Sequence, residues 1–223
     1  MVRLPVGSWS VSTNTLSERH EKRIDMASKK TLNAQNLETL GAERLAQLLI
    51  EISTGDAGIK RRLRLELAGA QGPAEVAREV RKRLTTIARS RSFVDWHNRS
   101  ALVSDLSTQH RAIVEQIGSK DPAEALDLMW RFLALADSVF ARCDDSSGTV
   151  IEIFHDAIDS LGTIAETARP NPIALADRVY AALNENDYGQ YDGLIETLAP
   201  TMGNVGLQHL KGQMIELANT PTK

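Results

Sequence analysis

The chain has 223 residues, of which 42% are hydrophobic and 25% charged, with one cysteine and a formal net charge of −3 at pH 7. This length can bury a substantial core, since a folded chain of this size hides roughly 70% of its unfolded surface. A single cysteine excludes an internal disulfide and a multi-cysteine zinc or iron–sulfur site. No apolar run reaches the roughly 18 residues of a membrane span, so we expect a cytoplasmic protein without cofactor, metal or membrane contact.

The small net charge hides an uneven distribution along the chain. Residues 1–92 carry 17 Lys and Arg against 10 Asp and Glu, a net charge of +7. Residues 93–223 carry 9 against 19, a net charge of −10. The basic part can pair with the acidic part inside the fold, or the two parts can face different partners.

The first 25 residues are rich in Ser and Thr and show no hydrophobic period. They also lack the continuous apolar core of a secretory signal. We expect a disordered extension over residues 1–25 and a single helical-repeat domain over residues 26–223. Met26 is a second candidate for the natural start of the protein.

Nearly every later segment has the pattern of a helix, with Ala, Leu, Glu and Arg inside and Pro or Gly at the edges. The alternation from Arg62 to Leu67 also suits a strand, but Ile59, Leu63 and Leu67 fall on one helical face, which favours a helix. The predicted helices cover residues 33–40, 42–53, 57–69, 73–90, 95–117, 121–142, 148–167, 172–186, 191–199 and 203–218.

A shift of the sequence by about 50 residues aligns two parts of the chain with each other. Asp121-Pro122 and Asn171-Pro172 coincide as helix starts, with a side-chain cap before a first-turn proline. The other coincident pairs are Asp95 with Asp145, Asp127 with Asp177, Trp130 with Tyr180, and Leu133 with Leu183. We therefore predict an all-α fold of antiparallel helix pairs stacked as a short solenoid-like array, similar to HEAT or TPR proteins; a closed helical bundle is the alternative.

A basic surface is the first candidate site. Within 73–90, Val76, Val80, Leu84 and Ile87 form the expected buried stripe, and cations occupy the outer face. The candidate contacts for a polyanion or an acidic partner are Lys60, Arg61, Arg64, Arg78, Arg81, Lys82 and Arg89. The alternative is a solvated helix face, neutralised by Glu75 with Arg78 and Glu79 with Arg83 at helical spacing, or covered by the acidic part of the chain.

The stretch RCDDSSGTV around Cys143 is the second candidate site. Its spacing fails as a calcium loop, and the carboxylates of Asp144 and Asp145 oppose ionisation of the thiol. The residues better suit a junction between helices, with Asp145, Ser146 or Ser147 as a cap, and Thr149 with Glu152 as a capping box. Asp144 and Asp145 stay candidate polar contacts, which predicts that replacing them by alanine changes partner binding without changing the melting temperature.

Two further features concern the core and the end of the chain. His110 shares a helical stripe with Leu106 and Ile113, which predicts a core or interface histidine with one hydrogen-bond partner. An apolar stripe follows Gly203, and either earlier segments or a second molecule must cover it. The stripe consists of Leu207, Leu210, Met214 and Leu217. We expect self-association there, which light scattering would detect.

Three strings carry a resemblance to a known family: RRLRLELAGAQGPAEVAREVRKRLTTIARSRSFVDW, WRFLALADSVFARCDDSSG and GLQHLKGQM. From Met26 onward the chain resembles a bacterial family of functionally uncharacterised, all-helical repeat proteins. The resemblance implies a solenoid-like fold and supplies no activity, ligand or catalytic residue. Members look longer than this chain, which raises the expectation of a shortened copy.

No spacing supports an enzyme, and His97, His155 and His209 lie on separate predicted helices. The sequence therefore favours a non-enzymatic protein–protein interaction module. The alternative is a nucleic-acid-binding protein that uses the basic face.

Overall fold

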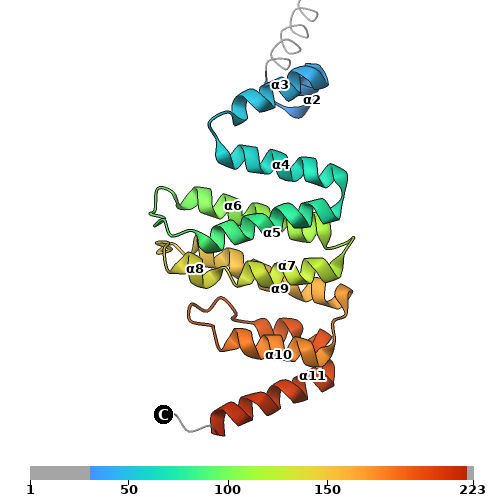
Figure 1. Ribbon diagram of the computed structural model, residues 1–223, viewed down its shortest axis with the longest axis vertical. Coiled ribbons are helices and arrows are strands. Elements are labelled where there is room, and N and C mark those ends of the chain that lie inside the picture. Colours follow the sequence, from blue (N-terminus) through green and yellow to red (C-terminus); the bar gives the residue numbers. More distant parts are fainter. Residues whose placement is uncertain (1–30, 220–223) are drawn as a thin grey trace, which may run out of the picture. The chain divides into compact units, whose positions relative to one another are not determined.

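The computed structural model describes residues 31–219 (Figure 1). The predicted extension over residues 1–25 lies outside this range. The chain divides into two compact units, with the boundary between Ala57 and Gly58. All regular structure in the described range is helical, and the only pairing of extended backbone there is an isolated bridge between Val94 and Cys143. The predicted all-α class is confirmed.

In the first unit the structure describes the helices α2 (Ala34–Glu38) and α3 (Gly41–Ser53). The side chain of Asn33 begins α2, because its Oδ1 accepts a hydrogen bond from the Asn36 amide at 2.8 Å. Gly41 begins α3 with φ of 77°, a backbone conformation that favours glycine.

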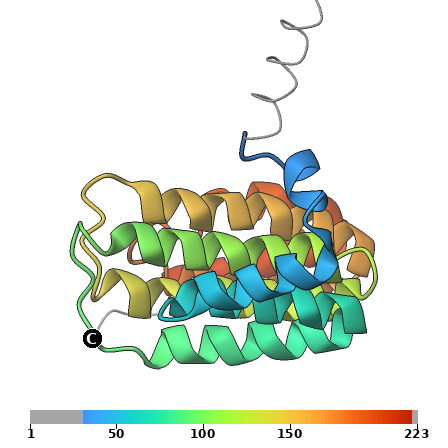
Figure 2. The same cartoon turned by 90° about the horizontal axis from the view of Figure 1, so that it is seen from above.

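The second unit holds the remaining helices, which run nearly along one direction when viewed from above (Figure 2). They are α4 (Ala57–Gln71), α5 (Pro73–Arg89), α6 (Arg99–Arg111), the π-helix η1 (Ala112–Ile117), α7 (Pro122–Leu133), α8 (Ala136–Phe140), α9 (Thr149–Ala168), α10 (Pro172–Leu183) and α11 (Leu194–Asn219). None of the helices within residues 31–219 combines the length and the apolar character needed to cross a membrane.

Helix α4 confirms the choice of helix over strand for Arg62–Leu67, and its buried face is not the one that carries Ile59, Leu63 and Leu67. Leu65 and Ala68 are the buried residues of this helix, whereas Leu67 is 66% exposed. The buried face is therefore turned by about half a turn of helix from the Ile59–Leu63–Leu67 stripe.

The two predicted proline-containing starts are confirmed. Asp121 Oδ1 accepts from the Glu124 amide at 3.1 Å, and Asn171 Oδ1 accepts from the amides of Ile173 and Ala174 at 3.0 and 3.1 Å. Helix boundaries recur at a spacing of 50 residues, since α6 begins at 99 and α9 at 149, while α7 covers 122–133 and α10 covers 172–183.

Two predicted helices, 121–142 and 95–117, differ from the observed elements. The segment 121–142 is two helices, α7 and α8, because the Leu135 amide bonds back three residues to Phe132 O at 3.0 Å and tightens the chain into a turn. The segment 95–117 begins only at Arg99, because Asp95 accepts from the Asn98 amide in a preceding turn. It ends in the π-helix η1.

Helix α11 contains the predicted break between 191–199 and 203–218. Gly203 has φ of 55° and ψ of −169°, so the helical path is interrupted at this residue. The two halves of α11 pack on α9 and α10 respectively (Figure 1). Gly206 faces the carbonyl oxygen of Pro172 so closely that a Cβ atom would lie 2.7 Å from it.

Helix α7 lies at the centre of the core, since it is buried over most of its surface. Phe132 of this helix contacts Phe154 of α9 with tilted rings and 5.5 Å between ring centroids. The buried residues of α7 are Ala125, Leu126, Leu128, Met129, Trp130, Phe132 and Leu133. His110 lies beside this core with a single hydrogen bond, from Nε2 to Ser160 Oγ at 2.9 Å, which confirms its predicted role.

The apolar stripe after Gly203 is largely covered within the chain. Leu210 is 4% exposed, and Leu207 and Met214 are partly buried against the core next to α10. Leu217 stays 46% exposed, together with Val205 and Ile215. Earlier segments therefore cover most of the stripe, and the predicted self-association would depend on the exposed remainder.

Candidate anion-binding groove

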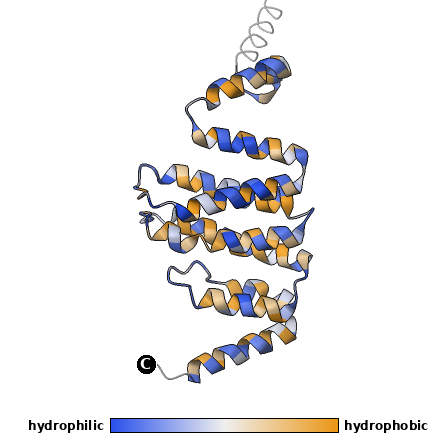
Figure 3. Ribbon diagram, in the orientation of Figure 1, coloured by the Kyte–Doolittle hydropathy of each residue, from blue (hydrophilic) through white to orange (hydrophobic). Residues whose placement is uncertain are grey.

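The candidate site is the basic surface of α4 and α5, where hydrophilic residues occupy long stretches of both helices (Figure 3). Helix α5 buries Val76, Val80, Leu84 and Ile87, as predicted, so its charged residues are turned away from the core. Residues 57–89 carry nine Lys and Arg against three Asp and Glu, a net charge of +6. This region holds nine of the 19 Lys and Arg of residues 31–219.

Three of the seven predicted contact residues have acidic partners within the second unit. Arg78 pairs with Glu75 on the same helix, as predicted, and Arg81 pairs with Glu124 in the first turn of α7. Arg61 Nη2 lies 3.7 Å from a carboxylate oxygen of Asp105 on α6. For these three arginines the structure favours pairing inside the fold.

The other four predicted cations are Lys60, Arg64, Lys82 and Arg89. They have no hydrogen-bonded or ion-paired side-chain partner among residues 31–219, and all four are exposed. Arg64 and Lys82 lie on facing helices, whereas Lys60 and Arg89 lie outside the pocket that the first two share. Two of the four unpaired cations are therefore brought together at one place.

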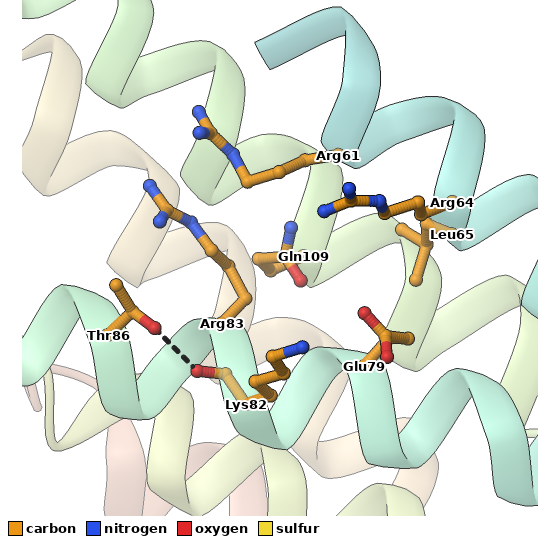
Figure 4. A pocket seen from close by; sticks show the side chains of 8 residues that line it. All are labelled: Arg61, Arg64, Leu65, Glu79, Lys82, Arg83, Thr86 and Gln109. Atoms are coloured by element: carbon orange, nitrogen blue, oxygen red, sulfur yellow. Dashed lines mark hydrogen bonds between the residues drawn. The ribbon is translucent and has the colours of Figure 1, made fainter. Parts of the chain in front are cut away.

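That place is a pocket of about 130 Å³ between α4 and α5, called here the α4–α5 groove. Its lining residues are Arg61, Arg64, Leu65, Glu79, Lys82, Arg83, Thr86 and Gln109. Figure 4 shows Arg61 and Arg64 on the α4 wall, Lys82 and Arg83 on the α5 wall, and Gln109 of α6 between the two walls. Cations thus approach the same space from opposite sides.

The groove continues at both ends. A hollow of about 310 Å³ shares Arg64, Glu79 and Lys82 with it and extends toward Arg78. Another hollow of about 250 Å³ shares Arg61, Arg83 and Thr86 and extends toward Arg142. An extended ligand could therefore occupy more than the central pocket.

The floor of the groove is organised by one buried carboxylate. The side chain of Asp105 is 8% exposed and accepts hydrogen bonds from Nε of Arg83, at 2.8 Å, and from Nη2 of the same guanidinium. The second carboxylate oxygen lies 3.4 Å from Nε2 of Gln109. The predicted pairing of Arg83 with Glu79 is not formed, because the guanidinium turns inward to the more buried acid.

Gln109 is 4% exposed, and its Oε1 has no hydrogen-bond partner among the described residues. The same is true of Nε of Arg61, which is also buried. Buried polar atoms normally have partners, because an unmet hydrogen bond costs about 1–3 kcal/mol. These two atoms are candidate partners for a polar ligand that displaces the side chains covering them.

The sequence did not identify Arg83, Asp105 or Gln109 as members of this site. Arg83 was assigned to a pair on its own helix, and Asp105 and Gln109 follow α5 in a different helix with no motif spacing. Only the approach of α6 to α4 and α5 brings them together. Their i, i+4 spacing on α6 is the single local signal, and it is common on helices.

The second predicted site, at Asp144 and Asp145, forms a junction. Both carboxylate oxygens of Asp145 accept hydrogen bonds from the amides of Val150 and Ile151, at 2.9 to 3.1 Å. The predicted capping box is not formed, because Gly148 is the residue that precedes α9 and no side-chain cap comes from Thr149. Asp144 is exposed and accepts from the Ser146 amide at 3.1 Å.

Cys143 lies in the same junction and not within a helix, since α8 ends at Phe140. Burial raises the pKa of its thiol, and the charge of Asp145 raises it further against the opposing effects of Arg99 and Arg142. A thiol with a raised pKa is a poor nucleophile at neutral pH. Within residues 31–219, no group of three or more His, Cys, Asp or Glu is placed to hold a metal ion.

Comparison with known proteins identifies the family. Residues 27–223 match the model of a family described as a family of unknown function, DUF6880. The chain belongs to this family, which confirms the resemblance to uncharacterised proteins. Neither the curated proteins nor the solved structures contain a significant match.

Proposed function

We propose that this member of DUF6880 is a non-enzymatic binding module that takes an acidic segment of a partner protein in the α4–α5 groove. The observation that carries the proposal is the pair Arg64 and Lys82, which face one pocket without an acidic partner among the described residues. Clusters of Arg and Lys of this kind are a recurring means of recognising acidic peptide motifs. The neighbouring arginines support the proposal by contrast, since Arg78, Arg81 and Arg83 already have carboxylate partners.

The shape of the lining favours a peptide over a nucleic acid. The pocket is small, and Glu79 in its wall and Asp105 beneath it would repel a continuous row of phosphates. No aromatic side chain lines it, so bases would have no ring on which to stack. A peptide segment places its negative charges at intervals and can also use the apolar contact with Leu65.

We also propose that the helices from α6 to α10 are two copies of one antiparallel unit within a short helical array. The support is the recurrence of helix starts at 99 and 149 and of whole helices at 122–133 and 172–183. A repeated unit exposes successive helices along one side, which suits recognition of an extended segment.

The proposed function can be tested by fluorescence anisotropy with a labelled oligoglutamate peptide and an oligoglutamine peptide of the same length. We expect salt-sensitive binding of the first peptide only. The variant Arg64→Glu with Lys82→Glu should lose this binding. The matched control, Lys60→Glu with Arg89→Glu, makes the same change in net charge outside the groove and should retain most of it.

Equal loss in the two double variants would contradict a groove and indicate attraction by net charge alone. The nucleic-acid alternative is tested with generic duplex and single-stranded DNA in the same titration. Affinity there should fall with a log–log salt slope of roughly 0.9 for each phosphate contacted. Tighter binding of DNA than of oligoglutamate would overturn the proposal in favour of that alternative.

A further inference from the structure

The residues around the α4–α5 groove carry more positive charge than one bound carboxylate would neutralise. Its lining contributes four cations, Arg61, Arg64, Lys82 and Arg83, and one carboxylate, Glu79. Asp105 beneath the floor adds a second negative charge. The local balance is therefore +2, whereas a single Asp or Glu side chain of a bound segment would supply only −1.

From this balance we infer that the groove recognises a phosphorylated side chain of a peptide segment, a proposal that rests on the acidic-segment function above. A phosphate monoester carries about −1.5 to −2 at neutral pH and presents three acceptor oxygens. Those oxygens point in different directions, so they can meet cations from the α4 wall and the α5 wall together. A carboxylate presents two oxygens in one plane and pairs best with one guanidinium.

The geometry assigns distinct roles to the two kinds of cation. Arg83 is fixed by two hydrogen bonds to Asp105, so its charge is held at the floor and its side chain is 24% exposed. Arg64 and Lys82 are unpaired within the described chain and free to close on a ligand from the rim. A fixed arginine below two adjustable cations can surround a tetrahedral group with little rearrangement of the helices.

Gln109 gives the reason for a peptide and not a free phosphate ion. Its Oε1 is an acceptor without a hydrogen-bond partner among residues 31–219, and it belongs to a pocket-lining side chain that is 4% exposed. A fully ionised phosphate has no hydrogen to donate to it. A backbone N–H next to the phosphorylated residue can donate, so a phosphopeptide satisfies both the cations and the buried amide.

The hollows at both ends of the groove leave space for the flanking residues of such a segment. They continue the pocket past Arg78 on one side and toward Arg142 on the other. The flanking residues of the peptide can therefore stay in contact with the surface when the phosphate occupies the central pocket.

The test is a calorimetric titration of the full chain with three peptides that differ at one central residue, phosphoserine, glutamate or serine, in a neutral flanking sequence. We expect the phosphoserine peptide to bind at least about tenfold tighter than the glutamate peptide, because one added charge-assisted hydrogen bond is worth roughly that factor. The serine peptide should not bind. Inorganic phosphate, titrated alone, should bind more weakly than the phosphopeptide.

Variants separate the roles of the residues. Arg64→Met and Lys82→Met should each weaken phosphopeptide binding about tenfold, whereas Arg89→Met, an exposed cation outside the groove, should leave it unchanged. Gln109→Leu should weaken the phosphopeptide without weakening inorganic phosphate. Circular dichroism of each variant verifies that the helical fold is retained.

Two results would overturn the inference. Equal affinities for the phosphoserine and glutamate peptides would refute phosphate recognition while leaving the acidic-segment function intact. Binding of inorganic phosphate as tight as that of the phosphopeptide would refute the role of the peptide backbone and of Gln109. If no acidic peptide binds, including oligoglutamate, then the proposed function fails as well.

Discussion

Replacing Asp105 by asparagine should destabilise the second unit markedly, because this carboxylate is the buried partner of Arg83. Asparagine keeps the shape of the side chain and can still accept from Arg83 through its one oxygen, but it removes the negative charge that balances the guanidinium groups of Arg83 and Arg61. Loss of one partner of a fully buried ion pair costs about 3–5 kcal/mol. Arg83 is 24% exposed and Arg61 35% exposed, so water can reach both guanidinium groups, and we expect a loss of about 2–3 kcal/mol.

Urea denaturation followed by circular dichroism measures this free energy of unfolding. Asp127→Asn is the matched control, since Asp127 pairs with Arg131 on the same helix but its side chain is 39% exposed. The control should lose less than about 1 kcal/mol. The double variant Asp105→Leu with Arg83→Leu should recover part of the loss, because it removes both members of the main ion pair and leaves only Arg61, whose side chain is 35% exposed, without its carboxylate.

A loss at Asp105 no larger than that of the control would refute the reasoning. It would mean that the hydrogen bonds from Arg83 are replaced by water at no cost. Failure of the double variant to recover stability would instead show that packing of the arginine stem, and not the charge, supports the α5–α6 contact.

Three further predictions concern other parts of the second unit. Burial lowers the pKa of His110, and the charge of Asp156 opposes this shift. Between the folded pKa and about 6.5 the unfolded state binds more protons, so the free energy of unfolding rises with pH. The urea midpoints at pH about 5.5 and 7.5 should therefore differ less in His110→Asn than in the unchanged protein. Gly162→Ala would place a Cβ 2.6 Å from Cγ2 of Thr197 and should lower the free energy of unfolding by about 1–3 kcal/mol. Adding Thr197→Ser, which removes that methyl group, should recover part of the loss. The control Gly212→Ala, at a position with no atom within 4 Å of the new Cβ, should show no loss. Asp145→Ala removes the cap of α9 and should cost about 1 kcal/mol and lower the melting temperature, whereas Asp144→Ala should not; equal melting temperatures would show that the cap is dispensable.

The last of these predictions revises an expectation from the sequence. The sequence predicted that alanine at Asp144 or Asp145 would leave the melting temperature unchanged. For Asp145 the hydrogen bonds to the amides of Val150 and Ile151 make a stability effect the expected outcome. A binding assay on that variant therefore has to be read together with its stability.

Local chemistry predicted most of the helices correctly. The side-chain caps at Asp121 and Asn171 and the buried stripe of α5 follow from interactions within one or two turns. The sequence did not identify the buried face of α4, because an exposed apolar stripe and a buried apolar stripe have the same helical period. Which stripe is covered depends on the helices that approach it, and Leu65 was chosen over Leu67 by those contacts.

In the candidate site, too, local features were predictable from the sequence and contacts between helices were not. The sequence placed a basic surface on α4 and α5, and the exposed members Arg64 and Lys82 were among its residues. Charge alone could not distinguish them from Arg78 and Arg81, whose partners lie on the same helix or on a helix more than forty residues away. Pairing across helices is a tertiary property, so it required the structure.

The bridge between Val94 and Cys143, together with the side chain of Arg142, affects how fast the backbone amides of two loops exchange their hydrogens. The Val94 amide donates to Arg142 O at 2.8 Å, and the Asp144 amide donates back to Val94 O at 3.1 Å. The Arg142 guanidinium also donates to the carbonyl of Ser92 at 3.2 Å. Connections between helices usually exchange their amide hydrogens fast and independently, because nothing ties one loop to the next.

Here the two loops can open only together. Deuterium uptake at Val94 and Asp144 should follow one common rate, slower than that of the exposed Ser146. The turns at this end of the helices would then be a late site of exchange and a poor site for proteolytic cleavage, although they are loops by every local criterion.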